Sequence, residues 1–280
     1  MSERPGQTTD FLRDSARLAR IAGAGLARLR ELRPLTQCVT NFVSMDLAAN
    51  ALHALGASPA MASAPEEAAD FARIAQALVC NIGTPSIERA MSLEAAALAF
   101  HEAGKPWVLD PVAVGATPFR AEIAMRLLDH KPTAIRGNAA EIIALARLAG
   151  AGDDFDPALP AAIGLARAAA CIVAATGPVD LVTDGTRVVQ IHNGSPLMTR
   201  VTAIGCALGA ATAAFLACAE DPFEMCMAAV AAFGVAGELA EQSGPAPMGP
   251  GSFRVHFIDR LFDLTPETLE RTARLDQGRA

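Results

Sequence analysis

The sequence predicts an α/β fold, a three-layer α/β/α sandwich in which helices cover both faces of a mostly parallel sheet. Short apolar runs alternate with longer helical patterns through most of the 280 residues, as in strand–helix–strand units. Of the residues, 52% are hydrophobic and 19% charged, which suits a chain with a large core. No Pro/Ser-rich linker divides it. We therefore expect a single domain over residues 34–280, preceded by a helical extension over residues 1–33.

Apolar runs and helical patterns place the elements in order along the chain. The predicted strands are Gln37–Asn41, Ser58–Ala62, Ala77–Ile82, Trp107–Asp110, Thr133–Arg136, Cys171–Ala175, Asp180–Thr183 and Val188–His192. The predicted helices are Met45–Leu55, Pro65–Gln76, Ser86–Ala103, Pro118–His130, Ile204–Ala219 and Pro222–Gln242. Asp184-Gly185 is a hairpin turn signal between the last two strands. The first 33 residues mix charged residues with Ala and Leu, which predicts a solvated helix and no signal peptide.

Composition excludes several classes of partner. The chain has 23 basic and 30 acidic residues, a net charge of −7, and one Trp with no Tyr, so nucleic-acid binding is not expected. Its six cysteines have no metal-site spacing and mostly lie in apolar runs, which indicates reduced core thiols of a cytoplasmic protein. The uncharged segment 201–219 is rich in Ala and Gly, so we expect a buried helix rather than a membrane span.

The segment Ile135-Arg136-Gly137-Asn138-Ala139-Ala140-Glu141 is the most informative motif. It indicates the end of a buried strand, a turn, and a helix with Asn138 as N-cap and Glu141 as the capping carboxylate. Arg136 then lies at the carboxyl edge of the sheet, where open α/β sheets bind ligands. Arg matches phosphate, and Glu is suited to Mg²⁺ held through water. The alternative is a capping box beside a surface Arg.

A second feature is the small-residue start of a long apolar helix, Ala203-Ile204-Gly205-Cys206. The first N–H groups of a helix lack internal partners, and the helix dipole favours an anion there. The segment matches neither a Walker loop nor a Rossmann GxGxxG. A phosphate cradle so late in the chain instead resembles the ribokinase-like superfamily, which transfers the γ-phosphate of ATP to small alcohols. The alternative is a helix start selected for packing alone.

Two further strand ends carry polar groups. Asp110-Pro111 ends an apolar strand, so Asp110 and Glu141 are expected near each other and suited to Mg²⁺. Thr176-Gly177-Pro178 ends another strand, and the Thr176 hydroxyl is placed to donate to a nucleotide phosphate. An Asp-Pro turn and a structural Thr-Gly turn are the alternatives.

Several motifs, in this order, resemble the hydroxyethylthiazole kinase family of thiamine salvage. They are GASPAM at Gly56–Met61, NIGT at Asn81–Thr84, LDPVAVGATPFR at Leu109–Arg120, AIRGNAAE at Ala134–Glu141, HNG at His192–Gly194 and GPGSF at Gly249–Phe253. The resemblance runs from about Pro34 to Phe257. It implies a ribokinase-like fold, phosphorylation of the hydroxyl of 4-methyl-5-(2-hydroxyethyl)thiazole with ATP and Mg²⁺, and homotrimers with sites at subunit interfaces.

The resemblance also implies a role for each matching residue. Arg136 and Thr176 would contact ATP, and Asp110 and Glu141 would organise Mg²⁺. Met61, Asn41 and Ala203 would contact the thiazole, and Ala203, Ile204, Gly205 and Cys206 would form the anion hole. A thioether suits a sulfur-containing ring, although Met61 also suits a core and Asn41 also suits a turn.

Cys206 occupies the place where ribokinase relatives usually carry an aspartate base. A helix N-terminus is expected to lower the pKa of a thiol. Phosphoryl transfer depends mainly on positioning, so we expect Cys206 to orient the hydroxyl. The alternative is a small buried Cys in an Ala-rich helix.

The match is imperfect at the anion hole. Most family members have Gly at the place of Ala203 and a small residue at the place of Ile204, and the Gly-Val-Asp element often found after the RGNAAE helix is missing from residues 150–159. Two alternative functions follow. One is a nucleotide-dependent dehydratase that repairs hydrated NAD(P)H, and the other is a non-catalytic sensor of a thiazole or a nucleotide.

Overall fold

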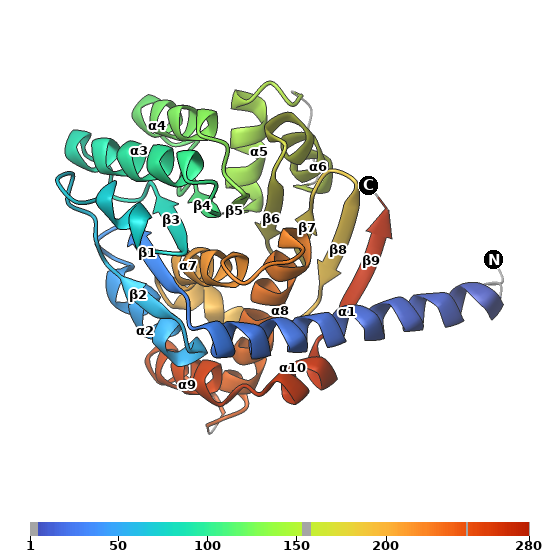
Figure 1. Cartoon of the computed structure of the whole chain (residues 1–280). Helices are drawn as coiled ribbons and strands as arrows, with labels where there is room; N and C mark the ends of the chain where they lie inside the picture. Colours follow the sequence, from blue (N-terminus) through green and yellow to red (C-terminus); the bar gives the residue numbers. More distant parts are fainter. Residues whose placement is uncertain (1–4, 153–157, 245, 280) are drawn as a thin grey trace.

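A nine-stranded sheet with the order β2-β1-β3-β4-β5-β6-β7-β8-β9 forms the centre of the molecule (Figure 1). The computed structural model describes residues 5–152, 158–244 and 246–279. The strands are β1 (Leu35–Val39), β2 (Ser58–Ala60), β3 (Ala77–Asn81), β4 (Trp107–Asp110), β5 (Ala134–Asn138), β6 (Ile172–Thr176), β7 (Asp180–Thr183), β8 (Arg187–Ile191) and β9 (Leu275–Arg279). Neighbours from β2 to β6 are parallel, and the pairs from β6 to β9 are antiparallel.

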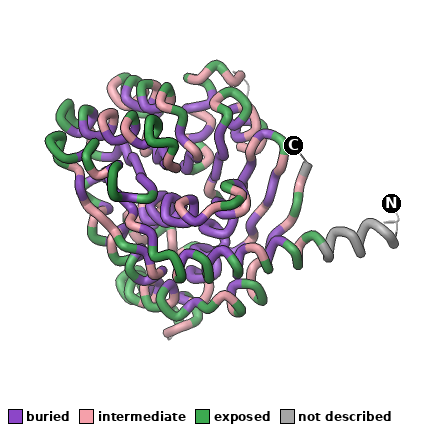
Figure 2. Tube along the Cα trace, in the orientation of Figure 1, coloured by how far each residue is buried: buried purple, intermediate pink, exposed green. Residues whose placement is uncertain are grey.

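Helices cover both faces of this sheet, which confirms the predicted three-layer sandwich. One layer contains η1 (Asp70–Arg73), α3 (Ile87–Glu102), α4 (Pro118–Asp129), α5 (Ala139–Leu148) and α6 (Ala158–Ala169). The other contains α1 (Pro5–Leu32), α2 (Met45–Leu55), η2 (Pro196–Arg200), α7 (Ile204–Leu216), α8 (Pro222–Glu241), α9 (Pro250–Asp263) and α10 (Pro266–Thr272). Figure 2 shows the strands largely buried between these layers, and α7 is largely buried within its own layer.

Alternation along the central strands divides the core into two clusters. On β3, Val79 packs with the α7–α8 layer, while Leu78 and Cys80 pack with the α3–α6 layer. On β4, Val108 packs with the α7–α8 layer and Leu109 packs with the α3–α6 layer. Successive side chains of a strand point to opposite faces, so strands buried on both faces must be apolar throughout. This explains the continuous apolar runs in the sequence.

The helix predicted over Pro65–Gln76 is wrong. The segment forms turns and the short 3₁₀ helix η1. Its carbonyl groups bond to side chains: Gln37 Nε2 donates to Ala68 O at 2.8 Å, and Lys105 Nζ donates to Ala72 O at 2.6 Å and to Ala75 O at 2.8 Å. The buried side chains of this segment are small alanines, which provide little apolar area to stabilise a helix.

The N-terminal segment is helical, as predicted, but the prediction that its helix is solvated is wrong for the second half. Leu18, Ala22, Leu26 and Leu29 are at most 2% exposed and belong to the same core cluster as α7 and α8. Their spacing of three and four residues places them on one face of α1. This face packs against α8 and α10, so α1 completes one helical layer.

The C-terminal end of the described chain contains an element that the sequence did not predict. Strand β9 pairs antiparallel with β8 and lies beside α1 (Figure 1). The predicted hairpin of β7 and β8 is confirmed. Segment 201–219 forms a short buried helix, α7, as expected. Helix α8 is long and apolar enough to cross a membrane, but 83% of its apolar window is buried inside the fold, as in a core helix.

Candidate active site

Five polar residues lie at the carboxyl ends of neighbouring parallel strands. They are Asn41, Asn81, Asp110, Arg136 and Thr176, and we call them the polar row. They belong to or follow β1, β3, β4, β5 and β6, which are adjacent in the sheet, and Asn81 lies directly beside Asp110 in the register. The carboxyl edge of a parallel sheet is the usual place for a ligand.

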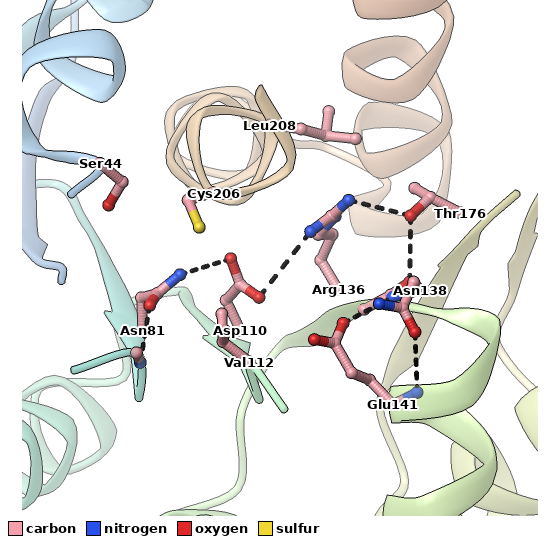
Figure 3. A network of polar contacts seen from close by, with 12 residues as sticks. Ser44, Asn81, Asp110, Val112, Arg136, Asn138, Glu141, Thr176, Cys206 and Leu208 are labelled. Atoms are coloured by element: carbon pink, nitrogen blue, oxygen red, sulfur yellow. Dashed lines mark hydrogen bonds and ion pairs between the residues drawn. The ribbon is translucent and has the colours of Figure 1, made fainter. Parts of the chain in front are cut away.

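Hydrogen bonds and one ion pair connect the polar row, and Figure 3 shows it from Asn81 to Thr176. Asn41 Nδ2 donates to Asn81 Oδ1 at 2.9 Å, and Asn81 Nδ2 donates to Asp110 Oδ2 at 2.7 Å. Arg136 Nη1 lies 3.9 Å from Asp110 Oδ1, and its Nη2 donates to Thr176 Oγ1 at 2.9 Å. The Thr176 hydroxyl in turn donates to Gly137 O at 3.3 Å. The row is therefore a connected polar network in the middle of the molecule.

Helix α7 begins directly over this network. Its N-cap, Ala203, has φ 73° and ψ 1°, a left-handed conformation, and provides no side-chain hydrogen bond to the first turn. The first N–H groups of the helix are thus left for another acceptor, with the positive end of the helix dipole behind them. The structure confirms a helix start at Ile204, as the small-residue motif predicts.

Two glycines allow α7 to approach the row closely. A Cβ on Gly205 would lie 2.6 Å from Arg136 Nη1, and a Cβ on Gly209 would lie 3.1 Å from Asp110 Oδ2. The two residues are four apart and therefore share one face of the helix. At position 205 the Arg136 guanidinium group takes the space of a side chain, so a larger residue there would displace this group. Arg136 consequently rests against the positive end of α7.

Asp110 is fully buried, and its environment changes its titration. Burial raises the pKa of Asp110 to about 7; Arg136 lowers it, Glu141 raises it, and the Asn81 hydrogen bond lowers it. The electrostatic effect of Glu141 agrees with the predicted proximity of the two carboxylates. Asp110 Oδ1 is buried and has no hydrogen-bond partner among the described residues. Its contact with Arg136 Nη1, at 3.9 Å, is too long for a hydrogen bond, so this buried oxygen marks a place where a ligand donor or a cation would fit.

Glu141 and Asn138 form the predicted capping box at the start of α5. Asn138 Oδ1 accepts from Glu141 N at 2.9 Å, and Glu141 Oε2 accepts from Asn138 N at 2.8 Å. Glu141 Oε1 accepts from Ala113 N at 2.8 Å, which fixes the loop after Asp110. Both carboxylate oxygens therefore have a structural hydrogen bond, and each keeps a second lone pair. Among the described residues, no three His, Cys, Asp or Glu side chains cluster as a direct metal site.

The expectation of a lowered pKa for Cys206 is wrong. Burial raises the pKa of this thiol, and the negative charge of Asp110 raises it further, against smaller lowering effects of Asn81, Asn41 and Arg136. Asn41 Nδ2 donates to Cys206 Sγ at 3.4 Å, so the sulfur accepts a hydrogen bond. The residue is a neutral thiol in contact with the polar row.

A cavity of about 760 Å³ opens on the Arg136 side of the helix start. Arg136, Thr176, Ile204 and Gly205 line it, which brings both expected nucleotide contacts together with two residues of the expected anion hole. The remaining described lining residues are Asn138, Gly177, Pro178, Asp180, His192, Asn193, Gly194, Ser195, Pro196, Met198, Thr199, Leu208, Phe233 and Gly234. A volume of this size suits a nucleotide.

Hydrogen bonds with residues outside the described cavity lining fix the HNG motif, His192–Gly194, in the cavity wall. Glu238 on α8 accepts from Gly194 N and from Asn193 Nδ2, both at 3.0 Å. Arg274 N donates to Asn193 Oδ1 at 2.7 Å, and Arg274 also bonds Glu238. Sequence analysis gave no role to Glu238 and Arg274, because their partners are distant in the chain.

Of the residues expected to contact the thiazole, Ala203 is the N-cap of α7, and Asn41 and Met61 follow the strands β1 and β2. Asn41 follows β1 and is buried, and its Oδ1 accepts from Val43 N at 3.0 Å and from Ser44 N at 3.1 Å, so it is both a turn residue and a neighbour of Cys206. Met61 follows the adjacent strand β2 and packs, half-buried, against the α7–α8 core. Neither residue belongs to the described lining of the 760 Å³ cavity.

Asn81 is a site residue that sequence analysis missed, although it begins the NIGT motif. Besides its side-chain contacts, its Oδ1 accepts from Gly83 N at 2.9 Å. The signal in the sequence was an amide at the end of the apolar run Ala77–Cys80, in the same position as Asp110 on the next strand.

Comparison with known proteins identifies the family to which this chain belongs. The hydroxyethylthiazole kinase family matches residues 26–267. A hydroxyethylthiazole kinase of Cereibacter sphaeroides is 52% identical over 260 residues, covering 91% of this chain and 98% of the relative. One of Rhizobium leguminosarum bv. trifolii is 51% identical over 260 residues, covering 90% and 96%. The chain belongs to the hydroxyethylthiazole kinase family.

Solved structures agree with this assignment. Hydroxyethylthiazole kinase from Pyrococcus horikoshii OT3 has a TM-score of 0.86 with 39% identity, covering 92% of this family member and 99% of that chain. Pyridoxal kinase from Staphylococcus aureus, in complex with AMP-PCP and pyridoxal, has a TM-score of 0.58 at 18% identity, covering 73% and 87%. The latter likeness concerns the fold alone, and together with the hydroxyethylthiazole kinase structure it agrees with the predicted ribokinase-like architecture.

Proposed function

We propose that the protein transfers the γ-phosphoryl group of ATP to the hydroxyl of 4-methyl-5-(2-hydroxyethyl)thiazole. Membership of the hydroxyethylthiazole kinase family, with relatives above 50% identity over most of the chain, carries the proposal. The geometry supports it, because Arg136, Thr176 and the start of α7 meet at one cavity beside Cys206. The product would be the thiazole phosphate ester of thiamine biosynthesis.

The groups at the start of α7 provide charge stabilisation. Arg136 and Thr176 bind the phosphates, and the amides from Ala203 to Cys206 surround the transferred phosphoryl group. Preorganised donors aimed at developing negative charge are an effective catalytic device, and phosphoryl transfer requires little other chemistry of the protein. The resting contact of Arg136 with Gly205 supports this role, because it already holds a cation where the phosphate charge would be.

Cys206 and Asn41 position the acceptor alcohol. The raised pKa keeps Cys206 protonated, so it is a hydrogen-bonding group and a poor base. Asn41 fixes the Sγ from one side, which leaves the S–H to meet the substrate hydroxyl. Met61 provides a polarizable apolar contact for the thiazole ring. The side chains of this chain thus orient the hydroxyl toward the phosphate.

Asp110 and Glu141 fit a magnesium site that is completed by water. Asp110 Oδ1 is buried and accepts no hydrogen bond from the described residues, and the Glu141 oxygens keep free lone pairs. Hard oxygen donors with few direct protein ligands are typical of Mg²⁺. When bound, Mg²⁺ would neutralise charge on the phosphate oxygens of ATP.

We further propose a homotrimer whose sites lie at subunit interfaces, working in the cytoplasm. An exposed apolar surface next to Asn41 supports the interface: Phe42, Val43, Ile87 and Met91 are 68%, 60%, 74% and 59% exposed, and we call them the Phe42 surface. Contiguous exposed apolar side chains commonly mark protein contacts. The six free cysteines suit a reducing compartment.

The decisive experiment is ADP release by the purified protein with Mg·ATP, with and without hydroxyethylthiazole, and with hydroxymethylpyrimidine as a control. Thiazole-dependent ADP is the expected result. Thiazole binding without ADP release would instead indicate a sensor, and consumption of hydrated NAD(P)H would indicate a dehydratase. Arg136→Ala is expected to raise the KM for ATP at least about tenfold, because a charge-assisted phosphate contact is lost.

A further inference from the structure

The 760 Å³ cavity has two chemically different parts. Arg136, Gly205 and Thr176 form its anion-binding part, and Pro178, Leu208, Met198 and Phe233 provide apolar lining. If the phosphates of a nucleotide occupy the first part, the apolar lining receives the nucleoside. Ligand sites combine such apolar walls with a few placed polar groups that decide specificity.

Asp180 is the carboxylate in this wall. It is the only acidic residue among the described lining residues, and it begins β7, four residues after Thr176. Side chains alternate along a strand, so Asp180 shares a face with Val182, which packs in the α7–α8 core. Asp180 therefore faces the layer that contains α7 and the cavity.

One carboxylate oxygen has a structural partner and the other does not. Asp180 Oδ1 accepts from Gly177 N at 2.9 Å, which closes the turn after Thr176. Oδ2 has no hydrogen bond to any described residue. Burial raises the pKa of Asp180 to about 6, while the Gly177 N–H and Arg136 lower it, so the group is mainly ionised at neutral pH. Asp180 thus presents an acceptor-only oxygen to the cavity.

The charge of this oxygen decides which part of a nucleotide it can meet. A carboxylate accepts hydrogen bonds and repels phosphate oxygens. The donors of a nucleoside triphosphate are the ribose hydroxyls and the exocyclic amine of the base. A site built to bond such a donor rejects analogues that lack it, because the buried acceptor is then left unpaired.

We infer that Asp180 selects the nucleotide of this enzyme by accepting a hydrogen bond from an uncharged donor of the nucleoside. The inference rests on the proposed kinase function. It adds to that function a residue that determines which nucleotide is used as phosphate donor. It predicts that Asp180 acts on the choice of phosphate donor and has no direct part in phosphoryl transfer.

The test compares Asp180→Asn with the wild type in the thiazole-dependent formation of nucleoside diphosphate from each phosphate donor. Asparagine keeps an oxygen for Gly177 N–H and replaces Oδ2 by a donor, so the turn is preserved. Asp184→Asn is the matched control: it removes the same charge at the other end of β7, where Asp184 bonds Thr186 and Arg187 outside the described cavity lining. Each protein is assayed with ATP, 2′-deoxy-ATP, 3′-deoxy-ATP and inosine triphosphate, and ADP binding is measured by calorimetry.

The wild type is expected to discriminate about tenfold or more against one of the three analogues, and the identity of that analogue names the donor. Asp180→Asn should lose this discrimination and raise the KM for ATP about tenfold, with weaker ADP binding, while Asp184→Asn keeps the wild-type ratios. If Asp180→Asn keeps the wild-type ratios of activity among the four nucleotides and the wild-type affinity for ADP, Asp180 only caps the turn at Gly177 and the inference is wrong. A wild type that forms no nucleoside diphosphate from any of the four nucleotides would overturn the kinase proposal itself, which separates the two failures.

Discussion

Ala203 carries a side chain in a backbone conformation that favours glycine. Its φ of 73° lies in the left-handed region, where a Cβ costs about 1 kcal/mol. We predict that Ala203→Gly raises the free energy of unfolding by about 1 kcal/mol because it removes this strain. The greater conformational entropy of glycine in the unfolded chain offsets part of the gain. Urea denaturation measures the change.

The same substitution at Ala214, inside α7, is the control for Ala203→Gly. There the backbone is right-handed and the side chain is fully buried, so Gly should destabilise by about 1 kcal/mol or more. Destabilisation at both positions would mean that Ala203 is held without strain.

Asn81 is the central residue of the polar row. Asn81→Ala would leave Asp110 Oδ2 and Asn41 Nδ2 without their bond in the buried network. We predict a loss of about 2–3 kcal/mol in the free energy of unfolding, because unpaired buried polar groups keep their full desolvation cost. Asn50→Ala, on the exposed side of α2, should change stability by less than about 0.5 kcal/mol in the same denaturation experiment.

At the level of single residues, the sequence was most informative where chemistry and position coincide. Arg136 and Asp110 follow apolar strands, so their place at the sheet edge could be predicted, and the structure joins them by an ion pair. The capping box of Asn138 and Glu141 could be read from spacing alone. The raised pKa of Cys206 could not be predicted from the sequence, because it depends on burial and on Asp110, which lies ninety-six residues earlier in the chain.

Among the elements, α1 is part of the core rather than an appendage. Leu26 is fully buried between α1 and the α7–α8 layer. We predict that Leu26→Ala lowers the free energy of unfolding by about 2–5 kcal/mol, through lost apolar burial and the cavity that remains. Leu32→Ala on the same helix, at a side chain that is 47% exposed, should cost much less, and thermal melting compares the two. Equal effects would place α1 outside the cooperative unit.

Elements with strong periodicity were predicted and elements made by distant contacts were not. Helix α2 and strands β4 and β7 have the predicted bounds because local pattern alone specifies them. The segment around η1 looked helical, but Gln37 and Lys105 bond its carbonyl groups from other parts of the chain. Strand β9 has a polar sequence, Leu-Asp-Gln-Gly-Arg, and becomes a strand because β8 offers a free edge.

For the molecule as a whole, the Phe42 surface makes a prediction about assembly. Arg89 stacks on the Phe42 ring at 4.7 Å, so this exposed aromatic side chain is held in place beside the site. We predict that Phe42→Glu converts the proposed trimer to monomers and reduces kcat, because a charge in an apolar interface is costly and a site proposed to lie at that interface would be incomplete. Light scattering after gel filtration measures the mass.

Phe262→Glu is the matched control, since Phe262 is 69% exposed on α9. It should leave both mass and activity unchanged. A monomeric wild type with full activity would contradict the proposed assembly.

The bonds from Arg274 and Glu238 to the HNG wall have a consequence for biosynthesis. The anion-binding end of the cavity is encoded before residue 210, whereas Asn193 Oδ1 accepts its hydrogen bond from Arg274 N, near the end of the described chain. During synthesis this bond can form only after Arg274 has been added, so this wall of the cavity is completed late.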